Sequence, residues 1–112
     1  MSATLTHLTI DCADALGQAA FWAAVLDQPV ADGGSAECAV VGASPAWMFL
    51  QVPEAKAVKN RMHPDLTTTD LQAEVGRLVA LGATKLAEHT EGGATWVTLS
   101  DPEGNEFDVV TG

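Results

Sequence analysis

The sequence predicts an α+β fold made of two similar halves, each running strand, helix and then three strands. One observation behind this is a spacing that occurs twice: His7 precedes Asp14, and His63 precedes Asp70, by seven residues. The two pairs are offset by 56 residues, which is half of the 112-residue chain. The other observation is that the predicted elements follow in the same order in both halves. Together they indicate an internal duplication.

The first half is predicted from strand alternation and helix-end residues. Residues 4–12 alternate between apolar and polar side chains, as a half-buried strand does. A helix is expected from about Ala15 to Asp27, because Asp14 is a suitable N-cap and Pro29 prevents continuation. Three strands are predicted to follow: a short, weakly marked one between residues 28 and 37, then residues 38–41 and 46–52.

The second half begins after a polar connection at residues 53–60. Residues 61–67 can form a strand. Thr69-x-x-Gln72 has the form of a capping box, and Gly82 suits the position just after a helix. The remaining strands are predicted at residues 85–88, 95–100 and 106–111. We therefore expect one domain over residues 1–112, with modules at about 1–55 and 60–112.

Composition excludes several classes of partner. The chain has 15 Asp and Glu against 5 Lys and Arg, a net charge of −10, so neither nucleic acid nor an anionic membrane is an expected partner. Hydrophobic residues make up 47% of the chain, enough for a core. No segment resembles a membrane span or a signal peptide, and two cysteines form no disulfide framework. A soluble cytoplasmic protein is expected.

Four segments carry a resemblance to a known superfamily. They are Phe21-Trp22, Lys59-Asn60-Arg61-Met62-His63, residues 77–83 (Arg-Leu-Val-Ala-Leu-Gly-Ala), and residues 101–107 (Asp-Pro-Glu-Gly-Asn-Glu-Phe). In these segments the chain resembles the vicinal oxygen chelate superfamily of glyoxalases, bleomycin-resistance proteins and dioxygenases, especially its small glyoxalase-like branch. The resemblance implies two βαβββ modules that form a cupped, eight-stranded mixed sheet, with helices outside and a pocket inside. It also implies a homodimer.

The same resemblance implies a metal site. Metal-using members take their ligands from the first and last strands of each module, and those positions hold His7, Gln51, His63 and Asp108 here. Strand alternation places all four on the more polar face of their strands. Their donor atoms suit one Zn²⁺, Ni²⁺, Mn²⁺ or Fe²⁺ ion. Lyases of the glyoxalase I kind typically have Glu where this chain has Asp108, and Gln51 is neutral.

Several functions remain open from the sequence. Trp47, Phe49 and Trp96 are expected to line the pocket and bind substrate, with core packing as the alternative for each. The basic residues of the range 56–61 either attract an anionic ligand or form a solvated connection. The favoured function is a metal-dependent lyase, isomerase or oxygenase acting on a small oxygenated molecule. The alternatives are a metal-free protein that binds or sequesters a small molecule, of the bleomycin-resistance kind, and a non-catalytic dimer.

Overall fold

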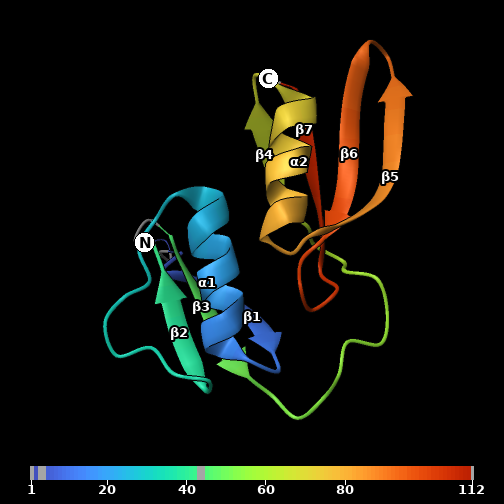
Figure 1. Cartoon of the computed structure of the whole chain (residues 1–112). Coiled ribbons are helices and arrows are strands. Elements are labelled where there is room, and N and C mark those ends of the chain that lie inside the picture. Colours follow the sequence, from blue (N-terminus) through green and yellow to red (C-terminus); the bar gives the residue numbers. More distant parts are fainter. Residues whose placement is uncertain (1, 3–4, 43–44, 112) are drawn as a thin grey trace. The chain divides into compact units, whose positions relative to one another are not determined.

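The structure is a computed structural model that describes residues 2, 5–42 and 45–111, and it divides into two compact units (Figure 1). The first unit is Met1–Ala55 and the second is Lys56–Gly112. The elements in chain order are β1 (His7–Cys12), α1 (Ala15–Leu26), β2 (Cys38–Val41), β3 (Ala46–Gln51), β4 (Asp65–Thr68), α2 (Leu71–Leu81), β5 (Thr84–Glu91), β6 (Ala94–Ser100) and β7 (Glu106–Thr111). Within the described ranges, neither helix is long and apolar enough to span a membrane.

The first unit is a three-stranded sheet with α1 on one face. The strand order is β1-β3-β2, with β1 parallel and β2 antiparallel to β3. Alternate strand residues face α1 and are buried, among them Ala39, Val41 and Phe49. The expected strand between residues 28 and 37 is a single bridge, Val30 with Val41, because a turn with Gly33 at φ 87° follows it at once.

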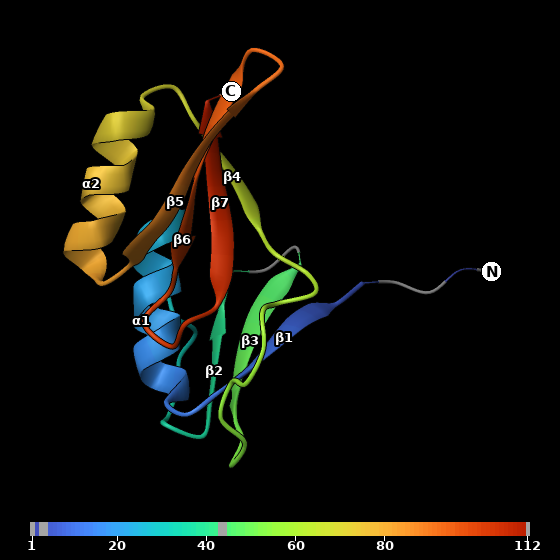
Figure 2. The ribbon, with the colours of Figure 1, turned by 90° about the vertical axis from the view of Figure 1, so that its right-hand side faces the viewer.

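The second unit is a four-stranded sheet with α2 on one face (Figure 2). The strand order is β4-β7-β6-β5, with β4 parallel to β7 and the other neighbours antiparallel. Leu78 of α2 is fully buried, as are four alternating strand residues that form the core beneath the helix. These are Val97, Leu99, Phe107 and Val109. Burial of each such side chain stabilises the fold by roughly 1.5–3 kcal/mol.

The α+β class is confirmed, but the strands differ from the expected eight in one sheet. The described residues form three strands in one sheet and four in the other. β4 begins only at Asp65, since Pro64 has no N–H for the ladder and contributes its carbonyl to Asp108 N (3.0 Å) instead. β5 is longer than expected and includes His89, which pairs with Trp96.

Both helices begin at an aspartate. Asp14 accepts a hydrogen bond from Gly17 N at 3.2 Å, and a Cβ at Gly17 would lie 2.5 Å from Asp14 Oδ2, so glycine leaves room for this cap. Asp70 accepts from Ala73 N at 3.1 Å, so it is the N-cap of α2. The capping box predicted one residue earlier, at Thr69, is therefore wrong. In each unit, the first strand ends two residues before the N-cap aspartate of the helix.

Candidate functional site

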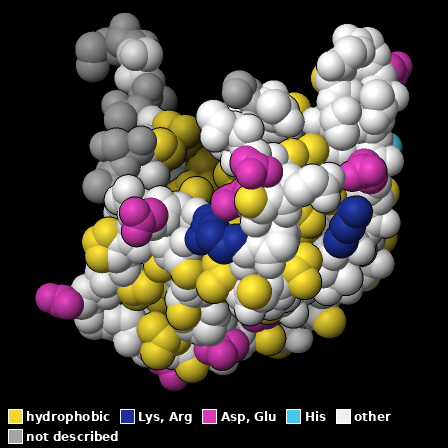
Figure 3. Space-filling view, turned by 45° about the horizontal axis from the view of Figure 1, so that its top comes forward, with side chains coloured by type: hydrophobic (Ala, Val, Ile, Leu, Met, Phe, Trp, Pro, Cys, Tyr) yellow, Lys and Arg dark blue, Asp and Glu magenta, His cyan; other side chains and the backbone are white. Residues whose placement is uncertain are grey.

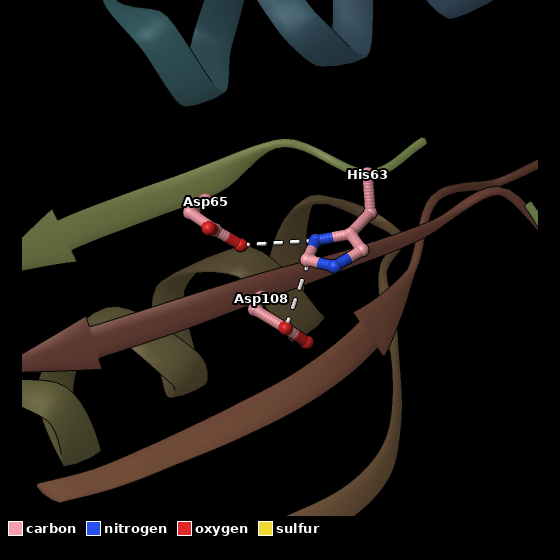
Figure 4. Close-up of side chains that lie close together, drawn as sticks. All are labelled: His63, Asp65 and Asp108. Atoms are coloured by element: carbon pink, nitrogen blue, oxygen red, sulfur yellow. Dashed lines mark ion pairs between the residues drawn. The ribbon is translucent and has the colours of Figure 1, made fainter. Parts of the chain in front are cut away.

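Three side chains of the second unit converge where β4 begins beside β7 (Figure 4). His63 lies just before β4, Asp65 is the first residue of β4, and Asp108 lies in β7. His63 Nδ1 is 2.9 Å from Asp65 Oδ1 and 3.7 Å from Asp108 Oδ2. Within the described part of the chain, no other three His, Cys, Asp or Glu residues bring their ligand atoms within 4.8 Å of one another. We call these three residues the His63 cluster.

The strand register explains why two carboxylates meet there. Asp65 and Asp108 are directly paired across the parallel strands, so their side chains emerge on the same face of the sheet. Phe107 and Val109, which flank Asp108, point to the opposite face and are buried. The cluster therefore lies on the face opposite α2. Like charges in paired positions repel each other, and a cation between them would offset that repulsion.

Thr98 of β6 fixes the orientation of one carboxylate. It is paired with Asp108, and its Oγ1 donates a 2.6 Å hydrogen bond to Asp108 Oδ1. The other oxygen, Oδ2, is the one nearer to His63. A hydroxyl that holds a carboxylate in this way is the kind of supporting contact that orients metal ligands. The site thus has both its donors and a partner that positions one of them.

Glu106 begins β7 two residues before Asp108 and joins the chain segment ahead of His63 to the sheet. Its Oε1 lies 3.0 Å from Lys56 Nζ and accepts from Asn60 N at 3.2 Å. Its backbone carbonyl accepts from Asn60 Nδ2 at 3.1 Å. Burial opposes the charged form, but Lys56 and the Asn60 N–H together hold the pKa of Glu106 below its usual value.

Comparison with known proteins identifies the family. The model of the glyoxalase-like domain matches residues 7–110, nearly the whole chain. The chain belongs to this family. This match confirms the superfamily expected from the sequence segments, and solved structures of glyoxalase, bleomycin-resistance and dioxygenase proteins share the fold. No curated protein matches the chain significantly.

Three solved structures illustrate the likeness of this glyoxalase-like domain. A glyoxalase/bleomycin resistance protein/dioxygenase family enzyme from Burkholderia phytofirmans PsJN has a TM-score of 0.80 and 19% identity, covering 97% of this chain and 98% of that one. The fosfomycin resistance protein FosX from Listeria monocytogenes has a TM-score of 0.78 and 14% identity, and the match covers 100% of this chain and 95% of that one. A lactoylglutathione lyase from Agrobacterium tumefaciens has a TM-score of 0.69 and 14% identity, and the match covers 100% of this chain and 96% of that one. At these identities the likeness shows a shared fold.

The other two expected ligands of the glyoxalase-like domain do not lie together within the first unit. His7 pairs with Ala46 at one end of β1 and β3, and Gln51 pairs with Cys12 at the other. The two positions are five residue steps apart along the strands, roughly 16 Å. Gln51 faces α1, as its buried strand partner Cys12 does. His7 is an odd number of residues from Cys12 in β1, so its side chain points to the opposite face of the sheet. The Gln51 amide donates to the carbonyl of Ala13 at 3.0 Å.

Of the three aromatic residues expected to line a pocket, two face α1. Phe49 is fully buried in the core, and the Trp47 ring lies 4.9 Å from that of Trp22 in α1. Trp96 differs, because it lies two residues from Thr98 on the same face as Asp108. Its ring stacks on His89 at 5.2 Å. Only Trp96 therefore shares a face with the His63 cluster.

The sequence matched Gln51 of the first module with Asp108 of the second as equivalent ligands, and Asp65 was not among the expected ligands. The signal for Asp65 was present, since period-two alternation puts it on the same face as His63. What the sequence lacked was the register that sets Asp65 opposite Asp108.

Proposed function

We propose that this glyoxalase-like domain binds one divalent metal ion at His63, Asp65 and Asp108, and acts with it on a small oxygenated molecule. The observation that carries the proposal is the convergence of one imidazole and two paired carboxylates on an open sheet face. The proposal keeps His63 and Asp108 from the expected ligand set and adds Asp65. His7 and Gln51 are retained only as positions to test.

The residues present fit such an ion chemically. One nitrogen and two carboxylate oxygens suit Zn²⁺, Ni²⁺, Mn²⁺ or Fe²⁺ with positions left for water or substrate. A divalent cation would also offset the repulsion between Asp65 and Asp108. Thr98 would hold Asp108 in place while Oδ2 is used as the ligand atom.

A metal bound here would polarise substrate oxygens and stabilise negative charge that develops on them. The chain's own residues would supply the surroundings: Thr98 positions Asp108, and Trp96 offers an aromatic surface for the apolar part of a bound molecule. A lactoylglutathione lyase shares the fold, which supports testing lyase, isomerase and oxygenase reactions. We further propose a single functional domain over residues 1–112 that works as a cytoplasmic homodimer.

The second candidate function is metal-free binding of a small molecule. The stacked rings of His89 and Trp96 favour it, because they place an aromatic surface on the same face as the His63 cluster. In this case the cluster would be a structural group, with the His63 imidazole 2.9 Å from Asp65 and 3.7 Å from Asp108. Binding would then depend on Trp96 and be indifferent to metal.

Calorimetric titration of chelator-treated protein with Zn²⁺, Ni²⁺, Mn²⁺ and Fe²⁺ tests the proposal. We expect about one ion per chain, with affinity lowered at least roughly 100-fold in His63→Ala and in Asp108→Asn. His89→Ala is the matched control, a histidine of the same sheet outside the cluster, and it should bind metal like the unaltered protein. His7→Ala and Gln51→Ala test the two remaining expected ligands. Equal affinity in His63→Ala and the control would overturn the metal site.

A further inference from the structure

Most of the few cations of this acidic chain are paired. Within the described ranges, Lys56 pairs with Glu106 (3.0 Å), Arg77 with Glu74 (2.8 Å) and Lys85 with Glu88 (3.9 Å). The other two, Lys59 and Arg61, are exposed and have no carboxylate within 4.0 Å in that part of the chain. On the face drawn in Figure 3, the Lys and Arg surface lies in separate patches with Asp or Glu side chains close by. Lys59 and Arg61 are therefore the two cations of the described residues that no carboxylate neutralises.

Both unpaired cations lie on the segment that leads into the His63 cluster. Arg61 is two residues and Lys59 four residues before His63, so their Cα atoms lie within roughly 7 Å and 14 Å of the His63 Cα. The extended side chains can bring their charged groups near any ligand held at the cluster. Neither residue belongs to the cluster itself.

Contacts to Glu106 hold this segment in place. Lys56 and Asn60 both bind the Glu106 carboxylate, and Asn60 also binds its backbone carbonyl. Lys56 Nζ donates in addition to the carbonyl of Val58, which closes the segment on itself. Glu106 is thus paired with Lys56 and Asn60, while Lys59 and Arg61 have no carboxylate within 4.0 Å among the described residues. The contacts to Glu106 thus hold residues 56–61 next to the His63 cluster, and the charges of Lys59 and Arg61 are left unneutralised there.

We propose that Lys59 and Arg61 select an anionic substrate, a small molecule that uses oxygen atoms at the metal and carries a carboxylate or similar anionic oxygen group. This rests on the proposed function. A chain with a net charge of −10 repels anions in general, so an anionic substrate needs a local region of positive potential to approach. Lys59 and Arg61 provide that region next to the cluster, where a substrate anion takes the place of the missing carboxylate partner.

The test uses the Mn²⁺-loaded protein and oxalate, a dianion with adjacent oxygen donors, in calorimetric titrations at low ionic strength. The double variant Lys59→Gln, Arg61→Gln should bind oxalate roughly tenfold more weakly, as expected for two charges about 12 Å from a dianion in water. The difference should shrink in 0.5 M salt. The double variant Arg77→Gln, Lys85→Gln is the matched control, because it changes the net charge equally, and it should bind oxalate within about twofold of the unaltered protein.

A neutral probe separates charge from shape. Oxamide, the uncharged diamide of oxalate, presents two adjacent carbonyl oxygens without losing a proton, and its affinity for the Mn²⁺-loaded protein should be the same in both double variants. Equal oxalate affinity in the two double variants, or an equal loss for the neutral probe, would overturn the inference. If Mn²⁺ does not bind at all, the proposed function fails. The same oxalate titration on metal-free protein then decides the inference: a selective loss in the Lys59 and Arg61 variant supports it, and no selective loss rejects it.

Discussion

Asp65 and Asp108 occupy paired positions on two parallel strands, and the imidazole of His63 is 2.9 Å from the first carboxylate and 3.7 Å from the second. Two carboxylates in such positions weaken the sheet unless something positive lies between them. The arrangement therefore links the stability of the second unit to what occupies the site.

Replacing one of these carboxylates should separate stability from metal affinity. In the metal-free protein, Asp65→Asn should be as stable as the unaltered chain or more stable by roughly 0.2–1 kcal/mol, because it removes the repulsion and keeps an oxygen facing His63. Added Zn²⁺ should raise the melting temperature of the unaltered protein more than that of the variant. Thermal unfolding followed by circular dichroism, with chelator or with metal, measures both. A marked loss of stability in the metal-free variant would show that the carboxylate is structural.

The hydroxyl of Thr98 should matter to the metal through Asp108. Thr98→Val keeps the shape of the side chain but removes the 2.6 Å hydrogen bond, and we expect metal affinity to fall roughly 10- to 100-fold. Thr98→Ser keeps the hydroxyl and should restore most of the affinity. Thr95→Val, which removes the hydroxyl contact between Thr95 and Thr90 in the same hairpin, is the control. Calorimetric titration would count against this role if the serine and valine variants behaved alike.

Lys56 and Glu106 should be energetically coupled. A double-mutant cycle with Lys56→Gln and Glu106→Gln, measured by urea unfolding at pH 7, should give a coupling free energy of roughly 0.5–1.5 kcal/mol. The value lies above that of an exposed pair because the Glu106 side chain is only 15% exposed and also accepts from Asn60. Strictly additive effects of the two substitutions would mean that the ion pair does not hold the segment.

Phe49 should behave as a core residue. It is fully buried against α1, so Phe49→Leu should lower the free energy of unfolding by roughly 1–2 kcal/mol. Trp96 lies in the second unit, on the sheet face that α2 does not cover. Trp96→Leu should lower the free energy of unfolding by less, because Trp96 is only partly buried. Urea unfolding of both variants makes the comparison. A Phe49 variant as stable as the unaltered chain would return this residue to the list of pocket candidates.

Glu74 contributes to the loss of stability at acid pH. The hydrogen bond from Arg77 lowers the pKa of Glu74 from its usual value of 4.5. Because the folded-state pKa is the lower one, Glu74 contributes stability above pH 4.5 and loses it as the pH falls below that value. Glu74→Gln should therefore be less stable at pH 7, by roughly 0.2–0.5 kcal/mol, with the difference vanishing under acid conditions. Unfolding measured from pH 7 to pH 3 checks this, and a difference that grows toward low pH would contradict it.

The sequence predicted elements well where local signals decide them. Asp14 and Pro29 bracket α1, and Gly82, at φ 124°, follows the last residue of α2. It failed where the outcome depends on pairing between distant strands. Alternation assigns residues to two faces, but only the contact with a helix decides which face is buried. For Trp47 and Phe49 the sequence therefore left pocket lining and core packing open, and the structure places Phe49 in the core and Trp47 against Trp22 of α1.

The candidate site likewise separates what position in the sequence can predict from what depends on strand pairing. His63 and Asp108 could be chosen from position, and the structure brings them together. Gln51 was matched to Asp108 because each is the third residue of a similar strand ending. The register instead matches Asp108 with Met48, since Asp65 pairs with Asp108 and Thr9 with Met48. Those paired residues are 43 and 39 positions apart, so the second unit has four extra residues between its first and last strands. A fixed repeat offset could not show that difference.

The pairing of Thr9 with Met48 has a consequence for how the two copies tolerate change. The first unit repeats the parallel ladder of the second but carries no acidic pair at this place. Under the proposed function, selection for metal binding acts on Asp108, whereas Met48 at the matching position of the first unit is constrained by packing. In a saturation mutagenesis screen for function, Met48 should accept many apolar substitutes, whereas Asp108 should accept almost none.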